Sequence, residues 1–173
     1  MPACVAYPWS MLQAFDVSAG VFMRGLTNLK TLLTKGEAHG TKVTRGHVVV
    51  LAFFTTWCPA SRSTLRAIEA LRVREAPSDL EVIAVGEGES AAAVASFAVS
   101  LGVRTPVAWD KGGAVATQLG VPTVPAVLVI ARDGTLRHVH AGYHGDEDGT
   151  AIRREVDLEL GQAAPSVPPA RRD

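Results

Sequence analysis

The sequence predicts an α/β domain in which helices cover a mixed β-sheet. Short apolar runs alternate with amphipathic stretches along most of the chain, as in parallel strands that are joined by helical crossovers. An Asp-Gly dipeptide separates the last two apolar runs, so the last two strands are expected to be antiparallel. The length of 173 residues favours one domain.

The first strand is expected over residues 48–54, a continuous run of β-branched and aromatic side chains that is typical of a strand buried on both faces. An amphipathic helix should follow over 61–75, because apolar residues recur there on one side. Pro77 ends this helix, and residues 80–85 form a second apolar strand. Ser90 is suited to cap the next helix, since its hydroxyl oxygen can accept a hydrogen bond from a backbone N–H.

The second half of the domain continues with a short strand over 106–109 and a short helix over 114–119 that ends at Gly120. A third apolar strand is expected over 126–131. The Asp-Gly turn at 132–135 then returns the chain into the last strand.

That last strand covers residues 136–141, and a final helix is expected over 150–160. Three acidic residues, Asp146, Glu147 and Asp148, are expected to lie in a loop ahead of this helix and to cap its positive end.

The two ends of the chain differ from this central part. Residues 1–25 lack a clean period and are interpreted as an N-terminal extension, whereas 26–161 form the folded domain. Within that domain, a leucine stripe predicts a short helix at 26–33, and glycines predict turns or a weak hairpin at 34–46. Residues 162–173 are expected to be a disordered tail rich in Pro and Arg.

The charge balance and hydropathy exclude some classes of partner. Seventeen basic and seventeen acidic residues cancel, so no nucleic-acid partner is expected. No apolar run approaches the roughly 20 residues of a membrane span. No Lys or Arg precedes Arg24, which argues against a signal peptide and predicts a cytoplasmic protein. A truncated start would instead allow a periplasmic or membrane-associated one.

Cys58 lies where the first strand passes into a helix. The free N–H groups and the macrodipole of a helix start stabilise an anion, and the thiolate is the reactive form of cysteine. Pro59 is pre-set for a first helical turn, and Trp57 would give an apolar surface beside the sulfur. A reactive thiol is therefore predicted, with a buried structural cysteine as the alternative.

These residues carry a family resemblance. The segment Trp57-Cys58-Pro59-Ala60-Ser61 resembles the Trp-Cys-x-x-Cys site of thioredoxin-fold proteins, and its flanks are similar to the TlpA/ResA-like branch near the AhpC/TSA redoxins. Residues 120–126 resemble that branch's cis-proline segment, and residues 132–134 its following hairpin. The resemblance runs from about 43 to 143 and implies a thioredoxin-like three-layer fold.

The resemblance also assigns roles around the thiol. Pro125 would be a cis-proline facing the sulfur of Cys58, and Val124 would pair its backbone with a substrate peptide in the manner of a strand. Trp57 and Pro59 would complete the substrate-binding surface. An ordinary loop proline ahead of a strand is the alternative for Pro125.

Three positions depart from the family pattern. Ser61 replaces the second cysteine, so no Cys-x-x-Cys disulfide can form. Ala52 stands where thioredoxins carry a buried acidic proton acceptor, and Thr64 where ResA-like proteins often carry a glutamate. Ser61 is interpreted either as natural or as an engineered replacement, and its hydroxyl could donate a hydrogen bond to the thiolate of Cys58.

The remaining candidate groups give weaker patterns. Cys4, on the extension, is expected to be a bystander thiol, since a resolving role would require the extension to fold back over Cys58. His138 and His140 alternate along a strand and are expected on a solvated face. Neither a metal site nor a cofactor is predicted.

The function predicted first is thiol–disulfide exchange by Cys58 as a single thiol, through a mixed disulfide that an external thiol releases. Protein or small-molecule disulfides and low-molecular-weight thiols would be its partners, and the oligomeric state is left open. Thr55, three residues before Cys58, also echoes the Thr-x-x-Cys of peroxiredoxins, although Leu51 replaces their upstream proline. A thiol peroxidase is therefore one alternative, and a non-catalytic binding module is the other.

Overall fold

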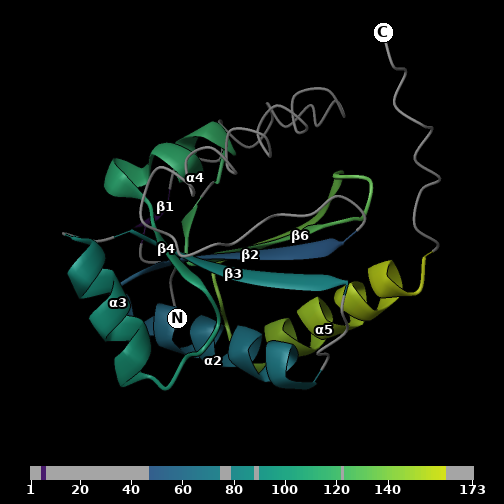
Figure 1. Cartoon of the computed structure of the whole chain (residues 1–173), viewed down its shortest axis with the longest axis horizontal. Helices are drawn as coiled ribbons and strands as arrows, with labels where there is room; N and C mark the ends of the chain where they lie inside the picture. The colour runs from purple at the N-terminus through teal and green to yellow at the C-terminus, as the bar shows by residue number, and fades with distance from the viewer. Residues whose placement is uncertain (1–4, 7–46, 75–78, 88–89, 122, 163–173) are drawn as a thin grey trace, which may run out of the picture.

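The computed structural model describes residues 5–6, 47–74, 79–87, 90–121 and 123–162. A mixed sheet of five strands lies at its centre, between helices on both faces (Figure 1). In spatial order the strands are β4 (Val107–Trp109), β3 (Leu80–Glu87), β2 (Val48–Thr55), β6 (Ala126–Ile130) and β7 (Leu136–Ala141). β2, β3 and β4 run parallel, β6 pairs antiparallel with β2, and β7 pairs antiparallel with β6. The predicted three-layer α/β fold is confirmed.

The helices divide between the two faces of the sheet. One face packs against α2 (Pro59–Arg74), α3 (Ala91–Ser100) and α5 (Asp146–Leu160), and α4 (Ala114–Gln118) covers the other after the short 3-10 helix η2 (Lys111–Gly113). Ser90 caps α3 as predicted, because its Oγ accepts a hydrogen bond of 3.1 Å from the backbone N–H of Ala93.

β2 is the central strand, and all eight of its residues are buried. Its side chains alternate between the two cores: Phe53 packs on the side of α4, and Phe54 packs on the side of α2. Each fully buried side chain of this size contributes roughly 1.5–3 kcal/mol to folding. The strand that leads to Cys58 is therefore held on both faces and along both edges.

The last helix differs from its prediction. α5 begins at Asp146, four residues before the predicted start, so the acidic residues form its first turn and not a preceding loop. Negative side chains are favourable in a first helical turn, because the unpaired N–H groups there carry partial positive charge. The sequence predicts a loop here because consecutive charged residues without an apolar period are typical of loops.

The histidines of β7 also differ from their prediction, because they are partly covered by α5. His140 Nε2 lies 2.6 Å from Glu155 Oε2, and His138 Nδ1 lies 3.5 Å from Glu155 Oε1. Glu159, which is 3% exposed, approaches His138 Nε2 at 3.6 Å. The histidines of β7 therefore find acidic partners on another element, because Glu155 and Glu159 lie one turn apart on α5.

Several predictions fall outside the described residues: the helix at 26–33, the turns at 34–46, most of the extension, the tail beyond Gln162, and Cys4. Within the extension, residues 5 and 6 are described. They form the two-residue strand β1 (Val5–Ala6), which pairs antiparallel with β5 (Thr123–Val124).

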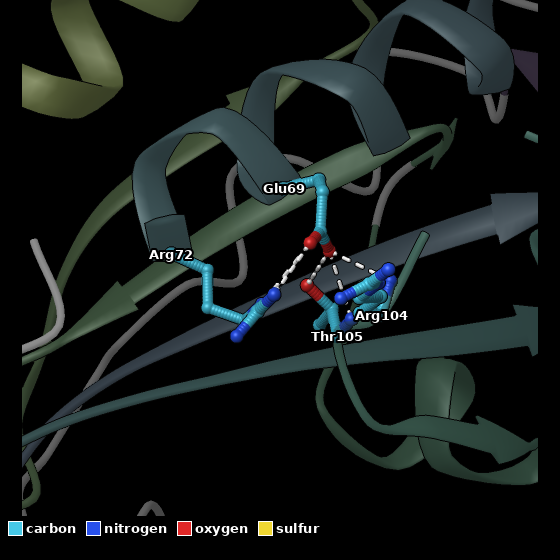
Figure 2. A network of polar contacts seen from close by, with 4 residues as sticks. All are labelled: Glu69, Arg72, Arg104 and Thr105. Carbon is cyan, nitrogen blue, oxygen red and sulfur yellow. Dashed lines mark hydrogen bonds and ion pairs between the residues drawn. The ribbon is translucent and has the colours of Figure 1, made fainter. Parts of the chain in front are cut away.

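The carboxylate of Glu69 ties α2 to the loop between α3 and β4 (Figure 2). Glu69 Oε2 accepts hydrogen bonds from the backbone N–H groups of Arg104 and Thr105, at 3.0 and 2.8 Å, and from the Thr105 hydroxyl at 2.8 Å. Glu69 Oε1 lies 2.6 Å from Arg72 Nη2. Burial raises the pKa of Glu69, but these hydrogen bonds outweigh burial and lower it to about 2.

This carboxylate is expected to make the fold acid-sensitive. Because the folded pKa lies below the unfolded value of 4.5, its contribution is complete above about pH 4.5 and is lost as the pH falls towards 2. After an allowance for partial exposure, we expect the contribution to be about 2 kcal/mol. Glu69→Gln should lower the free energy of unfolding at pH 7 by this amount and flatten its dependence on pH between 4.5 and 2. Asp157→Asn, at an exposed position of α5, is the control. Equal acid sensitivity of Glu69→Gln and wild type in urea titrations would contradict the assignment.

Candidate functional site

Cys58 lies at the carboxyl edge of the parallel strands, between the end of β2 and the first residue of α2. It is 1% exposed. The backbone turns tightly here, because the N–H of Ser61 donates to the carbonyl of Cys58 at 3.1 Å. Trp57, immediately before the cysteine, is 57% exposed, and Pro59, immediately after it, is also exposed. The sulfur is thus recessed between two exposed neighbours at the start of a helix of sixteen residues.

Ser61 is fully buried in the first turn of α2. Its Oγ accepts a hydrogen bond of 3.1 Å from the backbone N–H of Thr55, at the end of β2. This bond closes the β2–α2 turn around Cys58 from the inside. The Ser61 hydroxyl, which replaces the family's second thiol, therefore stabilises the turn. Donation of a hydrogen bond from this hydroxyl to the thiolate of Cys58 stays a prediction.

The segment before β6 comes to the same edge of the sheet. Ala126, the first residue of β6, pairs with Phe53 of β2, so the preceding Val124 and Pro125 lie beside the end of β2. The Val124–Pro125 peptide bond is cis. The carbonyl of Pro125 accepts a hydrogen bond of 2.8 Å from the N–H of Gly142, which fixes this segment to the end of β7. Val124 and Pro125 are both buried.

Cys58 is disulfide-bonded in the structure. The chain contains one other cysteine, Cys4, which directly precedes β1 and lies outside the described residues. An oxidised Cys58 does not fit the expectation of a lone thiol with a bystander cysteine elsewhere. Cys58 can thus exist as a free thiol or as one half of a disulfide.

Ala52 and Thr64, which stand where the family carries proton-accepting carboxylates, are both fully buried. Ala52 lies in the core beneath α2. The Thr64 hydroxyl donates to the carbonyl of Ala60 at 3.1 Å, within its own helix. Neither position supplies a group that could take up a proton during exchange.

Two carboxyl groups at this edge of the sheet escaped the sequence analysis. Glu87 ends β3 directly opposite Thr55, and Asp110 follows β4. Asp110 is 2% exposed and accepts hydrogen bonds from the N–H groups of Val115 and Ala116, both at 2.9 Å. Burial, and then the charge of Asp110, raise the pKa of Glu87.

Glu87 can consequently hold a proton at a higher pH than an ordinary glutamate. The signal that could have found both residues is their position, since each ends or follows a parallel strand at the edge where Cys58 also lies.

Within the described ranges, no helix is long and apolar enough to cross a membrane. In the same part of the chain, no group of three or more His, Cys, Asp or Glu side chains is placed to hold a metal ion. The cytoplasmic location remains a prediction.

The sequence pattern of the AhpC/TSA family matches residues 26–139. The chain belongs to this family. Among curated relatives, the thioredoxin-like protein YneN of Bacillus subtilis is 30% identical over 88% of this chain and 87% of YneN. The thiol-disulfide oxidoreductase ResA of Bacillus thuringiensis is 31% identical over 52% of this chain, and the match spans only 52% of ResA.

The fold of this AhpC/TSA family member also matches solved structures. A Chlorobium tepidum protein described as a thiol:disulfide interchange protein, DsbE, superposes with a TM-score of 0.64 at 24% identity, over 68% of this chain and 82% of that one. The TlpA/ResA-like, thioredoxin-fold resemblance is thereby confirmed. At this level of identity, the likeness to DsbE shows the fold alone.

Proposed function

We propose that this AhpC/TSA family member is a thiol–disulfide oxidoreductase in which Cys58 is the attacking thiol. The observation that carries the proposal is a disulfide-bonded cysteine directly before α2, at the edge of the sheet to which the cis Val124–Pro125 bond also comes. The name of the relative ResA supports the same chemistry. Ser61 is assigned to the site as the group that holds the β2–α2 turn closed, and Trp57, Pro59, Val124 and Pro125 as its substrate-binding surface.

The exchange begins with the thiolate of Cys58. It attacks one sulfur of a substrate disulfide, so a Cys58–substrate disulfide forms, the substrate disulfide breaks, and the second substrate sulfur leaves as a thiolate that takes up a proton. A second thiol must then attack Cys58 to release the substrate. Because position 61 is serine, the sequence prediction assigns this step to a low-molecular-weight external thiol.

Regeneration of the enzyme balances the electrons. One external thiol attacks Cys58, forms a disulfide with it and releases the substrate as a thiol. A second external thiol then attacks the first, so the two external thiols leave as a disulfide and Cys58 is again a free thiol. The substrate disulfide gains two electrons, and the two external thiols lose them. Protein and small-molecule disulfides are the proposed substrates.

The reactivity of reduced Cys58 tests the proposal. Because the sulfur stands at a helix start, we expect its alkylation rate to rise with pH to a midpoint below about 8.5, the value of a free cysteine. Iodoacetamide labelling of Cys4→Ser, reduced and repurified, isolates the signal of Cys58. A midpoint at or above the free value in this folded variant would favour the binding module. A steady-state hydrogen peroxide assay separates the thiol peroxidase, which should turn over peroxide at least as fast as a disulfide.

A further inference from the structure

The strand β1 lies on the backbone beside the cis-proline. Val5 pairs with Val124, and Ala6 pairs with Thr123, in an antiparallel ladder. Val124 directly precedes Pro125, so β1 occupies the strand position that the resemblance assigns to a substrate peptide. A segment from the start of the chain has therefore folded back to the edge at which Cys58 lies.

The position of β1 points to a partner for Cys58. Val5 lies opposite Val124, which directly precedes Pro125, and the residue before Val5 in the sequence is position 4. That position is Cys4, the one other cysteine of the chain, and Cys58 is disulfide-bonded although position 61 carries a hydroxyl. The oxidised state of Cys58 and the pairing of β1 with β5 are separate observations, and together they point to Cys4 as the partner.

We propose that Cys4 is the resolving cysteine of this site, delivered by β1. This proposal rests on the proposed function and replaces the first external thiol in it. After Cys58 has formed a mixed disulfide with the substrate, the thiolate of Cys4 attacks the sulfur of Cys58. The Cys4–Cys58 disulfide forms, the Cys58–substrate disulfide breaks, and the substrate leaves as a thiol after it takes up a proton.

The electrons balance within one turnover. The substrate disulfide gains two electrons, and the pair of Cys4 and Cys58 loses them. An external dithiol, or two thiols, then reduces the Cys4–Cys58 disulfide and is itself oxidised to a disulfide.

The same geometry makes β1 a competitor of the substrate. A peptide that pairs with Val124 needs the backbone edge that Val5 uses, so β1 must leave before such a peptide binds and return to resolve it. The chain thus carries a substrate-like strand and its resolving thiol in one segment.

A single turnover without added thiol tests the proposal. Reduced, desalted protein is mixed with an excess of a peptide that carries one internal disulfide, and the products are followed by intact mass spectrometry after acid quenching. Wild type should release the reduced peptide and form a disulfide that non-reducing peptide mapping assigns to Cys4 and Cys58. Cys4→Ser should form the Cys58–peptide adduct and release the peptide at least about tenfold more slowly, because the intramolecular attack is lost.

A matched control moves the thiol along the same strand. Cys4→Ser/Ala6→Cys keeps one thiol on the same face of β1 but shifts it by two residues, about 6.6 Å. We expect it to release the peptide as slowly as Cys4→Ser. Equal release rates in wild type and Cys4→Ser, equal rates in wild type and the shifted variant, or a disulfide that links two chains would overturn the proposal. In each of these cases, formation of a Cys58–peptide adduct would still support the proposed function. If Cys4→Ser forms no such adduct, both the resolving role of Cys4 and the proposed function are contradicted.

Discussion

A Cys58→Ser variant is expected to reduce insulin disulfides at least about 10³-fold more slowly than wild type in the presence of excess dithiothreitol, after subtraction of the rate with dithiothreitol alone. The loss should be this large because, among the residues that the structure describes, Cys58 alone carries a thiol that can bond to substrate sulfur. The remaining cysteine, Cys4, is assigned to the resolving step and not to the first attack on the substrate. The fold should persist, since serine is close to cysteine in size, and circular dichroism checks this.

A relocated thiol shows whether the position or the mere presence of a thiol matters. Ser63 lies on the exposed side of the first turns of α2, five residues from Cys58 along the chain. Cys58→Ser/Ser63→Cys keeps the number of thiols and should be as inactive as Cys58→Ser. Substantial activity in either variant would remove Cys58 from the role of nucleophile.

Ser61→Cys in the Cys4→Ser background is expected to restore fast release of the substrate peptide, to at least the wild-type rate. Position 61 lies three residues after Cys58, one helical turn on, so its thiol would face the sulfur of Cys58. Well-oriented intramolecular reactions reach effective molarities of about 10⁵–10⁸ M, far above any external thiol. The single-turnover mass spectrometry described for Cys4→Ser measures the rescue.

A control variant and a stability measurement accompany this experiment. Ser63→Cys in the Cys4→Ser background places a thiol on the exposed face of the same helix and should give no rescue. The variant at 61 also loses the hydroxyl that accepts from the N–H of Thr55, so a small loss of stability is expected and is measured separately by thermal unfolding. A folded Cys4→Ser/Ser61→Cys protein that forms no disulfide between positions 58 and 61 under oxidising conditions would show that the two sulfurs do not meet.

The central fold could be predicted because its signals are local and redundant. β2 begins with a run of seven apolar residues, and a serine caps the start of α3, so each pattern identifies its element without knowledge of the rest. The position of Cys58 followed from these elements, since a cysteine between a buried strand and a helix lies at the carboxyl edge of a parallel sheet.

The parts that escaped prediction depend on partners remote in sequence. β1 has two residues and hence no period, and only its pairing with Val124 makes it a strand. The raised pKa of Glu87 comes from burial and then from the charge of Asp110, which follows a different strand. The histidines of β7 gain partners from α5, which a pattern along one strand does not contain.

The exposure of Trp57 has an optical consequence. Trp57 directly precedes Cys58 in the chain and is 57% exposed, and a disulfide at short range quenches indole fluorescence by electron transfer. Of the two other tryptophans, Trp109 is half-buried on β4, and Trp9 lies outside the described residues. The emission of Trp57 should therefore brighten when Cys58 is reduced, which gives the site a built-in reporter of its own oxidation state without any added dye or substrate.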